Sequence, residues 1–331
     1  MTRELRLGTR GSLLALWQAN AVAARIAEHG GPPCRIVTIK TTGDRLQDAP
    51  LSEAGGKRLF VKEIEDALLR DQIDLAVHSS KDLPVVLPDG LTIAAVLPRE
   101  DPLDAVVLPR TAAGAAVTSV EQLVASLGQT PSIGTGSVRR IAQLARLFPN
   151  ARFEPIRGNL DTRLRKLDDG SNDALILAAA GLRRLGFTDR ISMTLPAAVC
   201  VPAPGQGIVA IEIRRDDERV RAAVEPIGDA AAGAALAAER AAVVVLGGGC
   251  QTPIGALAVP MNDGTSGAAT ELDMIACVVA IDGSRAVRAE GRGSMHEAAA
   301  LGERIGAQLI QDGAADILEQ AQHASHDRQG D

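Results

Sequence analysis

Residues 132–148, SIGTGSVRRIAQLARLF, contain a short apolar run, a glycine-bearing turn and an amphipathic helix pattern in succession. The same strand-then-helix unit follows twice more, with residues 151–156 before 160–167 and residues 174–178 before 181–185. Strands that alternate with helices are typical of parallel or mixed sheets whose faces are covered by the helices. The segment therefore predicts an α/β fold.

The alternation extends in both directions from this segment. Upstream, we predict strands at residues 5–9, 34–40, 73–77 and 91–97, helices at 12–26 and 60–70, and a polar loop at 41–57. Downstream, we predict an Ala-rich helix at 229–246, strands at 208–213, 256–259, 272–281 and 286–292, and one closing helix from 297 to about 322. Proline-bearing transitions at residues 99–102 and 201–205 indicate two crossings between domains.

Composition narrows the class of protein. A chain of 331 residues is expected to form two or three domains. Its net charge of −6 and its aromatic content of 2% argue against nucleic-acid binding, which relies on basic faces and aromatic stacking platforms. No apolar run approaches the ~18 residues that a membrane span requires. With no apolar leader at its start, the chain is expected to be cytoplasmic, without a membrane partner.

Four cysteines are present, namely Cys34, Cys200, Cys250 and Cys277, and none has CxxC spacing. We therefore expect no zinc site, no other metal and no disulfide framework. Cys34, Cys200 and Cys277 are interpreted as small buried hydrophobes. Cys250 follows three glycines, which allow close approach by a bulky group, so it is either an exposed reactive thiol or a fourth buried hydrophobe.

Positive charge is concentrated in one segment. Residues 132–190 carry a net charge of +5, so the remainder carries −11. Arg139 and Arg140 fall in the first turn of a predicted helix, where the helix dipole disfavours cations and an anionic ligand would resolve the conflict. Arg157 and Arg163 flank the next strand-to-helix junction, the usual ligand crevice of open α/β sheets. A solvated basic face is the alternative for each arginine alone, but the four together favour a carboxylate-binding pocket.

Other candidate groups follow the ends of predicted strands. Asp82, beside Lys81 in the run HSSKDLP, is a candidate acid or base, or equally an ordinary turn residue. Arg10 and Ser12 lie at the first strand-to-helix junction, which suits an anion but lacks a dinucleotide fingerprint. Lys57, after two glycines, can reach an anion or remain exposed in solvent.

Taken together, these runs resemble the porphobilinogen deaminases, also called hydroxymethylbilane synthases. The resemblance covers nearly the whole chain. It rests on TRGS at 9–12 with LALWQ at 14–18, GGK at 55–57, HSSKDLP at 78–84, REDP at 99–102, GTGSVRR at 134–140, RGN at 157–159, PGQG at 204–207 and GCQTPIG at 249–255. Their order along the chain makes the combination specific.

The resemblance implies a three-domain α/β architecture. Residues 1–100 and 201–224 would form one periplasmic-binding-protein-like lobe with a mixed sheet, and residues 101–200 a second. Residues 225–331 would form a smaller α+β domain that carries Cys250. The implied enzyme is cytoplasmic and monomeric.

The resemblance also implies the reaction. A dipyrromethane cofactor, attached to Cys250 by a thioether, would prime the head-to-tail addition of four porphobilinogen molecules, each losing ammonia. Hydroxymethylbilane would be released by water and passed to the next enzyme of tetrapyrrole (heme) biosynthesis. No metal is implied.

Roles for individual residues follow from the matching motifs. Asp82 would be catalytic, because a carboxylate can bind pyrrole N–H groups, stabilise cationic intermediates and move protons. The residues implied to bind the cofactor are Cys250, Lys81, Arg139, Arg140, Arg163, Arg184, Ser79, Thr135 and Ser137. Those implied to bind substrate are Arg10, Ser12, Arg157, Gln206 and Lys57.

Two positions depart from the family pattern. Arg58 stands where a third glycine is usual, and Glu53 where some members have lysine, so the shape of the loop at 41–58 is open. Two other functions suit parts of the sequence. A two-lobed anion receptor is disfavoured by the Cys250-bearing third domain, and a cysteine hydrolase lacks a convincing His and Asn or Asp partner set.

Overall fold

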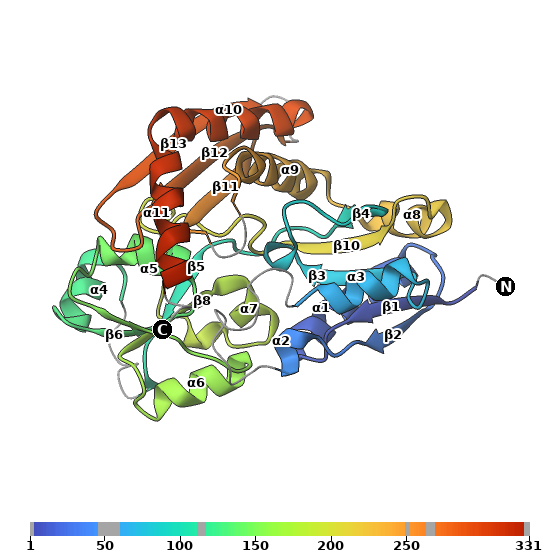
Figure 1. Ribbon diagram of the computed structural model, residues 1–331. Coiled ribbons are helices and arrows are strands. Elements are labelled where there is room, and N and C mark those ends of the chain that lie inside the picture. The colour runs from blue at the N-terminus through green and yellow to red at the C-terminus, as the bar shows by residue number, and fades with distance from the viewer. Residues whose placement is uncertain (1–2, 46–59, 111–116, 249–251, 263–268, 328–331) are drawn as a thin grey trace.

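The computed structural model describes residues 3–45, 60–110, 117–248, 252–262 and 269–327. These residues form three sheets, each with its own helices (Figure 1). Four positions singled out from the sequence lie outside the described residues: Glu53, Lys57, Arg58 and Cys250.

The first sheet is mixed, with strand order β2-β1-β3-β10-β4. Strands β1, β2 and β3 run parallel, whereas β10 is antiparallel to β3 and β4. Helices α1 and α8 bury Val22 and Val220 against one face, and α3 buries Ile64 and Leu68 against the other. The elements of this lobe are β1 (Leu5–Thr9), α1 (Leu13–Glu28), β2 (Cys34–Thr38), α2 (Thr42–Arg45), α3 (Lys62–Leu69), β3 (Leu75–Ser79), the 3-10 turn η1 (Ser80–Asp82), β4 (Leu91–Val96), β10 (Val209–Arg214), α8 (Glu218–Val224) and η4 (Glu225–Ile227).

The second sheet repeats this arrangement, with strand order β7-β6-β8-β5-β9. Strands β6, β7 and β8 run parallel, and β5 is antiparallel to β8 and β9. Apolar clusters cover both faces, around Leu144 on one side and Leu167 on the other. The elements are β5 (Asp104–Val107), α4 (Val120–Leu127), β6 (Ser132–Gly134), α5 (Val138–Ala145), β7 (Arg152–Glu154), α6 (Leu160–Asp168), β8 (Ala174–Ala178), α7 (Ala179–Arg184), η3 (Thr188–Arg190) and β9 (Met193–Leu195).

The two crossings connect these sheets. The first crossing leads from β4 into β5 and the second from β9 into β10, so each delivers the antiparallel strand of the sheet it enters. The second crossing needs glycine at two positions. Gly205 and Gly207 have φ values of +72° and +87°, and a Cβ on Gly207 would lie 2.2 Å from the Glu100 carbonyl oxygen. The sharp turns of the PGQG run therefore bring the two crossings together.

The third unit is an antiparallel sheet, β11-β12-β13, covered by helices. Its elements are α9 (Ala230–Val245), β11 (Ile254–Asn262), β12 (Ala269–Val279), β13 (Ala286–Ser294), the 3-10 turn η5 (Met295–Glu297), α10 (Ala298–Gln311) and α11 (Ala314–Asp327). The Ala-rich composition of α9 has a packing reason. A Cβ on Gly302 of α10 would lie 2.0 Å from the Ala238 carbonyl oxygen, so the two helices approach closely only because their contacting residues are small.

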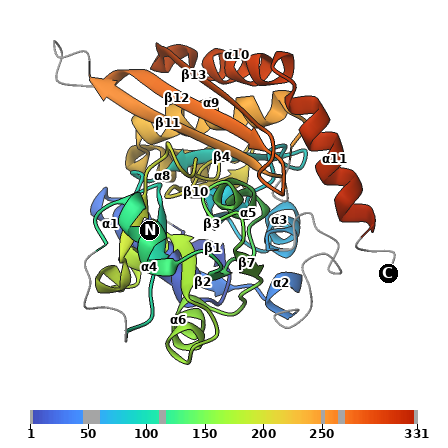
Figure 2. The same cartoon turned by 90° about the vertical axis from the view of Figure 1, so that its left-hand side faces the viewer.

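Two predicted elements are wrong. The closing helix predicted at 297–322 is two helices, because Gly313 adopts φ +95° between α10 and α11 and the chain changes direction there (Figure 2). The polar segment after residue 41 begins with the short helix α2 rather than a loop. The fold prediction is otherwise confirmed, since the described residues form two mixed α/β lobes and a smaller α+β domain. The boundaries 1–100 with 201–224, 101–200 and 225–331 stay a prediction.

Candidate functional site

The turn η1 separates two pockets. Strand β3 ends at Ser79, and the N–H of Ser80 donates to the Ile208 carbonyl (2.9 Å), which anchors the turn on the second crossing. Ser80 and Lys81 line a pocket where all three units meet, here named the central pocket. Asp82, the last residue of the turn, lines a second pocket, here named the N-terminal pocket.

The central pocket collects polar groups from every part of the fold. Its polar lining consists of Ser80, Lys81, Ser137, Arg139, Arg240 and Thr252, and apolar side chains such as Leu83, Val85, Leu236, Val243 and Ile254 complete it. Within the described part of the chain, two buried donors at this pocket have no hydrogen-bond partner: Ser80 Oγ and Arg139 Nε. A buried donor without a partner is energetically costly, so both groups favour an acceptor supplied by a ligand.

The N-terminal pocket lies where β1 meets α1. Ser12 caps α1 by accepting from the Ala15 N–H (3.3 Å), and Arg10 pairs with Asp44 (2.5 Å) and lies over the ring of Phe60 (4.4 Å). Burial opposes ionisation of Asp44, but Arg10 holds its pKa below the usual value. The pocket lining includes Arg10, Ser12, Gln18, Phe60, Ser79 and Asp82. The structure therefore brings the predicted substrate residues Arg10 and Ser12 next to the predicted catalytic carboxylate.

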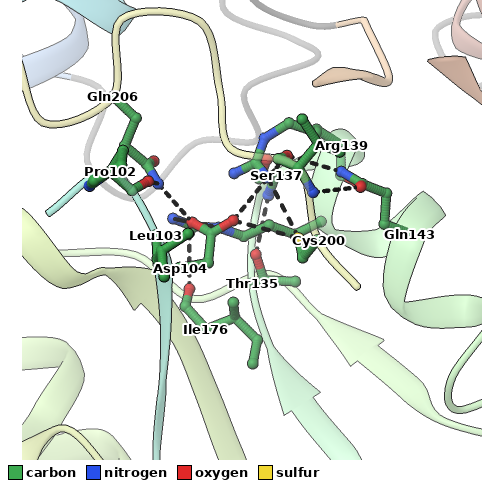
Figure 3. Close-up of polar contacts among 12 residues, drawn as sticks. Pro102, Leu103, Asp104, Thr135, Ser137, Arg139, Gln143, Ile176, Cys200 and Gln206 are labelled. Atoms are coloured by element: carbon green, nitrogen blue, oxygen red, sulfur yellow. Dashed lines mark hydrogen bonds and ion pairs between the residues drawn. The ribbon is translucent and has the colours of Figure 1, made fainter. Parts of the chain in front are cut away.

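A buried carboxylate, Asp104, organises the two arginines of α5, and Figure 3 shows it beside Arg139. Asp104 accepts from Arg139 Nη1 (2.7 Å) and from Arg140 Nε and Nη2 (3.0 and 2.7 Å). Burial alone would raise the pKa of the Asp104 carboxyl, but the charges of Arg139 and Arg140 hold it well below its usual range. The sequence indicated that an anionic ligand would offset the two cations at the start of α5. The structure shows that a carboxylate of the chain itself, Asp104, supplies this negative charge. Because one carboxylate meets two guanidiniums, a net positive charge remains.

Gln206 links this cluster to Lys81. Its Nε2 donates to the Pro102 carbonyl (2.7 Å) and to Asp104 Oδ1 (2.9 Å), while its Oε1 accepts from Lys81 Nζ (3.2 Å). Burial, with the nearby charge of Arg140, lowers the pKa of Lys81 to about 8. Lys81 is therefore a cation that titrates close to neutral pH.

The predicted arginines Arg163 and Arg184 both hydrogen-bond to backbone carbonyls of the protein. Arg163 donates from Nε to the Gly158 carbonyl (2.9 Å), and burial together with the charges of Arg140 and Arg157 lowers its pKa. Arg184 donates to the Gly207 carbonyl (2.7 Å), lies over the ring of Trp17 (5.5 Å) and has its pKa lowered by burial. Neither Arg163 nor Arg184 lines one of the two pockets described above.

Three other predicted site residues, Thr135, Ser79 and Arg140, make hydrogen bonds to the protein itself. Thr135 Oγ1 accepts from the Ser137 N–H (3.3 Å), and Ser79 Oγ accepts from Gln18 Nε2 (2.8 Å). Arg140 faces Asp104 and the Ile176 carbonyl rather than either pocket. The ligand-binding roles assigned to these residues stay predictions.

The three described cysteines have poor nucleophilic character. Burial raises the pKa of Cys34 and Cys277 to about 11 and that of Cys200 to about 12, so all three are protonated thiols at neutral pH. Cys200 is not a purely apolar contact, because its Sγ donates to Asp104 Oδ2 (3.3 Å). Cys250 lies outside the described residues, but Thr252, two residues later, lines the central pocket.

Sequence reasoning missed Asp104 and Gln18. Both carry a recognisable signal, which is a polar residue in an apolar pattern. Asp104 opens the otherwise apolar strand DAVV, and Gln18 lies on the buried face of α1 with Ala15, Ala19 and Val22. Buried polar residues of this kind usually belong to a hydrogen-bonded site.

The described residues also bear on metals and membranes. They contain no cluster of three or more His, Cys, Asp and Glu side chains suited to a metal ion. Among the same residues, no helix has both the length and the apolar character that crossing a bilayer requires.

The fold and the site together define a class of protein. Two mixed α/β lobes and a third domain surround adjoining pockets, one lined by Lys81 and Arg139 and the other by Asp82 and Arg10. Excess guanidinium and ammonium charge suits a ligand with several carboxylates, and a lone carboxylate beside it suits proton transfer or stabilisation of a cation. This is the arrangement of an enzyme that acts on polycarboxylate molecules.

Comparison with known proteins identifies the family. A profile described as "Porphobilinogen deaminase, dipyromethane cofactor binding domain" matches residues 5–222, and one described as "Porphobilinogen deaminase, C-terminal domain" matches residues 234–311. The chain is 45% identical over 323 residues to the porphobilinogen deaminase of Syntrophobacter fumaroxidans, covering 97% of this chain and 99% of that one. It is 44% identical over 325 residues to that of Acidithiobacillus ferrooxidans strain ATCC 53993, covering 98% and 100%. The chain belongs to the porphobilinogen deaminase family.

An ancestral cationic amino acid solute-binding protein aligns over 68% of this chain and 87% of its own, at 14% identity and a TM-score of 0.41.

The residues of the central pocket fit a dipyrromethane cofactor. The unpartnered donors Ser80 Oγ and Arg139 Nε and the ammonium of Lys81 suit the carboxylates that each pyrrole ring bears. The apolar side chains of the same pocket suit the rings themselves. The cofactor predicted from the sequence therefore agrees with the family profile and with the chemistry of the pocket.

Proposed function

We propose that the chain condenses porphobilinogen onto a dipyrromethane primer held by Cys250, with the primer in the central pocket and incoming substrate in the N-terminal pocket. The observation that carries this assignment is the position of η1 between the two pockets. Lys81 faces one pocket and Asp82 the other, so adjacent residues serve the two reacting partners. Thr252 lines the central pocket two residues after the thiol that would tether the primer.

Each addition breaks the aminomethyl C–N bond of a porphobilinogen, releases ammonia and forms a C–C bond to the free α-carbon of the growing chain, which loses a proton. The primer supplies the pyrrole α-carbon for the first addition. After four additions, water cleaves the bond between the primer and the first added ring: the hydroxyl goes to the methylene carbon of the product and the proton to the primer's α-carbon. Hydroxymethylbilane is the expected product, and it passes to the next enzyme of tetrapyrrole biosynthesis in the cytoplasm.

Asp82 is the residue we assign to this proton and charge balance. It is half-buried in the N-terminal pocket, and its charge acts on both Lys81 and Arg163. A carboxylate there can hold pyrrole N–H groups, stabilise the cation left when ammonia departs and accept the proton from the α-carbon.

The arginines are assigned to the carboxylates of substrate and primer. Lys81, Arg139 and Ser137 contact the primer from the central pocket, and Arg10 and Ser12 contact the substrate from the N-terminal pocket. The same two ligands are assigned a wider set of binding residues, namely Arg140, Arg157, Arg163, Arg184, Gln206, Ser79, Thr135 and Lys57.

Intact-protein mass under denaturing conditions tests the primer. The wild type is expected to exceed its polypeptide mass by one dipyrromethane, and Cys250→Ala is expected to show the bare mass. Cys277→Ala is the matched control, since its buried thiol has a raised pKa and should leave the adduct in place. A bare polypeptide mass in active wild-type enzyme would contradict the assignment.

Turnover tests the role of Asp82. Asp82→Asn keeps the shape of the side chain but removes its charge, so we expect turnover to fall by a factor of about 10²–10⁴ while the primer adduct remains. Turnover near the wild-type value would remove Asp82 from the mechanism.

A further inference from the structure

Asp104 is fully buried at the start of β5, directly after the first crossing. A buried carboxylate destabilises a fold unless charges and hydrogen bonds compensate it. The two oxygens of Asp104 accept from Arg139, Arg140, Gln206 and Cys200, which come from α5 and from the second crossing. Asp104 therefore joins groups from separate parts of the chain at one point.

The bond to Asp104 determines how Arg139 faces the central pocket. Arg139 directs Nη1 at Asp104 Oδ2 and at the Val201 carbonyl, both at 2.7 Å. A guanidinium is planar and its N–H groups point in fixed directions, so these two bonds set the orientation of the whole group. The remaining edge includes Nε, which is buried and without a partner among the described residues, and Arg139 lines the pocket.

Asp104 likewise determines which end of the Gln206 amide faces Lys81. The amide N–H groups are engaged by two acceptors, the Pro102 carbonyl (2.7 Å) and Asp104 Oδ1 (2.9 Å). The amide oxygen must then point the other way, where it accepts from Lys81 Nζ (3.2 Å). Without the Asp104 acceptor, one of the two bonds that fix this amide is lost.

We propose that Asp104 is a positioning residue, whose carboxylate directs Arg139 and, through Gln206, the Lys81 ammonium toward the same anionic ligand in the central pocket. Asp104 does not itself line the pocket. The proposal rests on the proposed function, since the ligand there is taken to be the primer.

The charges that face Lys81 give the proposal a pH signature. Arg139 and Arg140 disfavour its protonated form, whereas Asp82 and Asp104 favour it. Neutralising Asp104 removes one favourable charge and leaves both arginines. Lys81 should then lose its proton at a lower pH than in the wild type.

The test compares Asp104→Asn with the matched control Asp168→Asn in the same lobe, where Asp168 pairs with the buried Arg190 at 2.7 Å. Holoenzyme kcat/KM for porphobilinogen is measured from about pH 6 to about pH 10, with the primer-bearing fraction read from intact mass. For Asp104→Asn we expect a loss of about 100-fold in kcat/KM, a lower primer-bearing fraction and an alkaline limb at lower pH than in the wild type. The control should keep the wild-type limb and primer fraction. The amine of the substrate titrates in the same way with every variant. Differences in pH profile between variants therefore come from groups of the enzyme.

An Asp104→Asn enzyme with the limb, kcat/KM and primer fraction of the control would overturn the proposal. If Asp104→Asn does not accumulate as folded protein, Gln206→Met provides the test, because it removes the link to Lys81 and leaves the Asp104–arginine pairs. A shifted limb at an unchanged melting temperature supports the proposal, and an unchanged limb overturns it. If the wild-type protein lacks the added mass of the primer, the proposed function itself is wrong. Failure of the proposed function can therefore be distinguished from failure of the positioning role of Asp104.

Discussion

Two buried carboxylates lie beside the crossings, and their surroundings differ. Glu239 on α9 pairs with one guanidinium, Arg99 (2.5 Å), and accepts from the N–H groups of Gly205 (2.6 Å) and Ala258 (2.8 Å). Asp104 pairs with two guanidiniums, and Arg139 Nε has no partner among the described residues. The balanced pair is therefore a joint that holds the third domain to the crossings, whereas the unbalanced cluster has charge and a hydrogen-bond donor left for a ligand.

The balanced pair should have the largest effect on stability. Glu239→Ala leaves Arg99 buried without its counter-ion, and breaking a buried pair in this way costs about 3–5 kcal/mol of unfolding free energy. We expect that loss in urea denaturation, with activity per folded molecule retained. Glu303→Ala, at an exposed position on α10, is the control.

A double substitution sharpens this prediction. Arg99→Leu with Glu239→Leu removes both charges together, so it should recover most of the stability that Glu239→Ala loses. If Glu239→Ala matches Glu303→Ala within about 1 kcal/mol, the pair is not a joint and the comparison fails.

Substitutions in the unbalanced cluster around Asp104 should weaken ligand binding. Arg139→Leu removes the guanidinium that lines the central pocket, and losing a charged hydrogen bond there should cost about 2–3 kcal/mol in kcat/KM, or roughly 30–150-fold. Arg146→Leu, at an exposed position directly after α5, should stay near the wild-type value. Kinetics and intact mass check both variants. Equal kcat/KM values for the two would show that the excess charge does not bind the ligand.

The next largest effect is expected from the titration of Lys81, which should make kcat/KM depend on pH. Its pKa of about 8 means that the ammonium is present below this pH and is lost above it, so attraction for carboxylates falls as pH rises. We expect kcat/KM to decrease by about tenfold, or about 1.4 kcal/mol, near pH 9 relative to its plateau. Lys81→Arg keeps its charge over this range, so its profile should lack this limb. A wild-type profile that matches the Lys81→Arg profile would exclude Lys81 as the titrating group.

The smallest effect is expected where α1 meets α7. Arg184 lies 5.5 Å from the ring centroid of Trp17, the only tryptophan in the chain. A cation–π contact between a half-buried arginine and an exposed tryptophan contributes about 1 kcal/mol, so Arg184→Ala should change stability little but should alter Trp17 fluorescence. Arg183→Ala, which removes the neighbouring arginine paired with Asp101, should leave the emission unchanged. Identical spectra for the two variants would mean that the contact is absent in solution.

Much of the fold was predictable because local patterns and final structure agree. Strands β1 and β8 occur at the predicted residues, and helix α1 begins at Leu13, one residue after the predicted start. The division of the closing helix was missed because a glycine inside a helical pattern does not by itself reveal a positive φ. The short strand β5 was missed too, and with it the residue that pairs with both arginines of α5.

The sequence by itself determined the class of element along the chain, the concentration of arginine and the motifs that identify the family, because periodicity, charge and residue order are properties of the chain. Only the tertiary structure decided which charges cancel. The sequence predicted that an anionic ligand would neutralise Arg139 and Arg140. In the structure both pair with Asp104, which lies 35 residues from Arg139 and 36 residues from Arg140 in the chain. The physical reason is that a pairing across such a separation depends on how β5 and α5 pack, and this packing leaves Lys81 and one edge of Arg139 for the ligand.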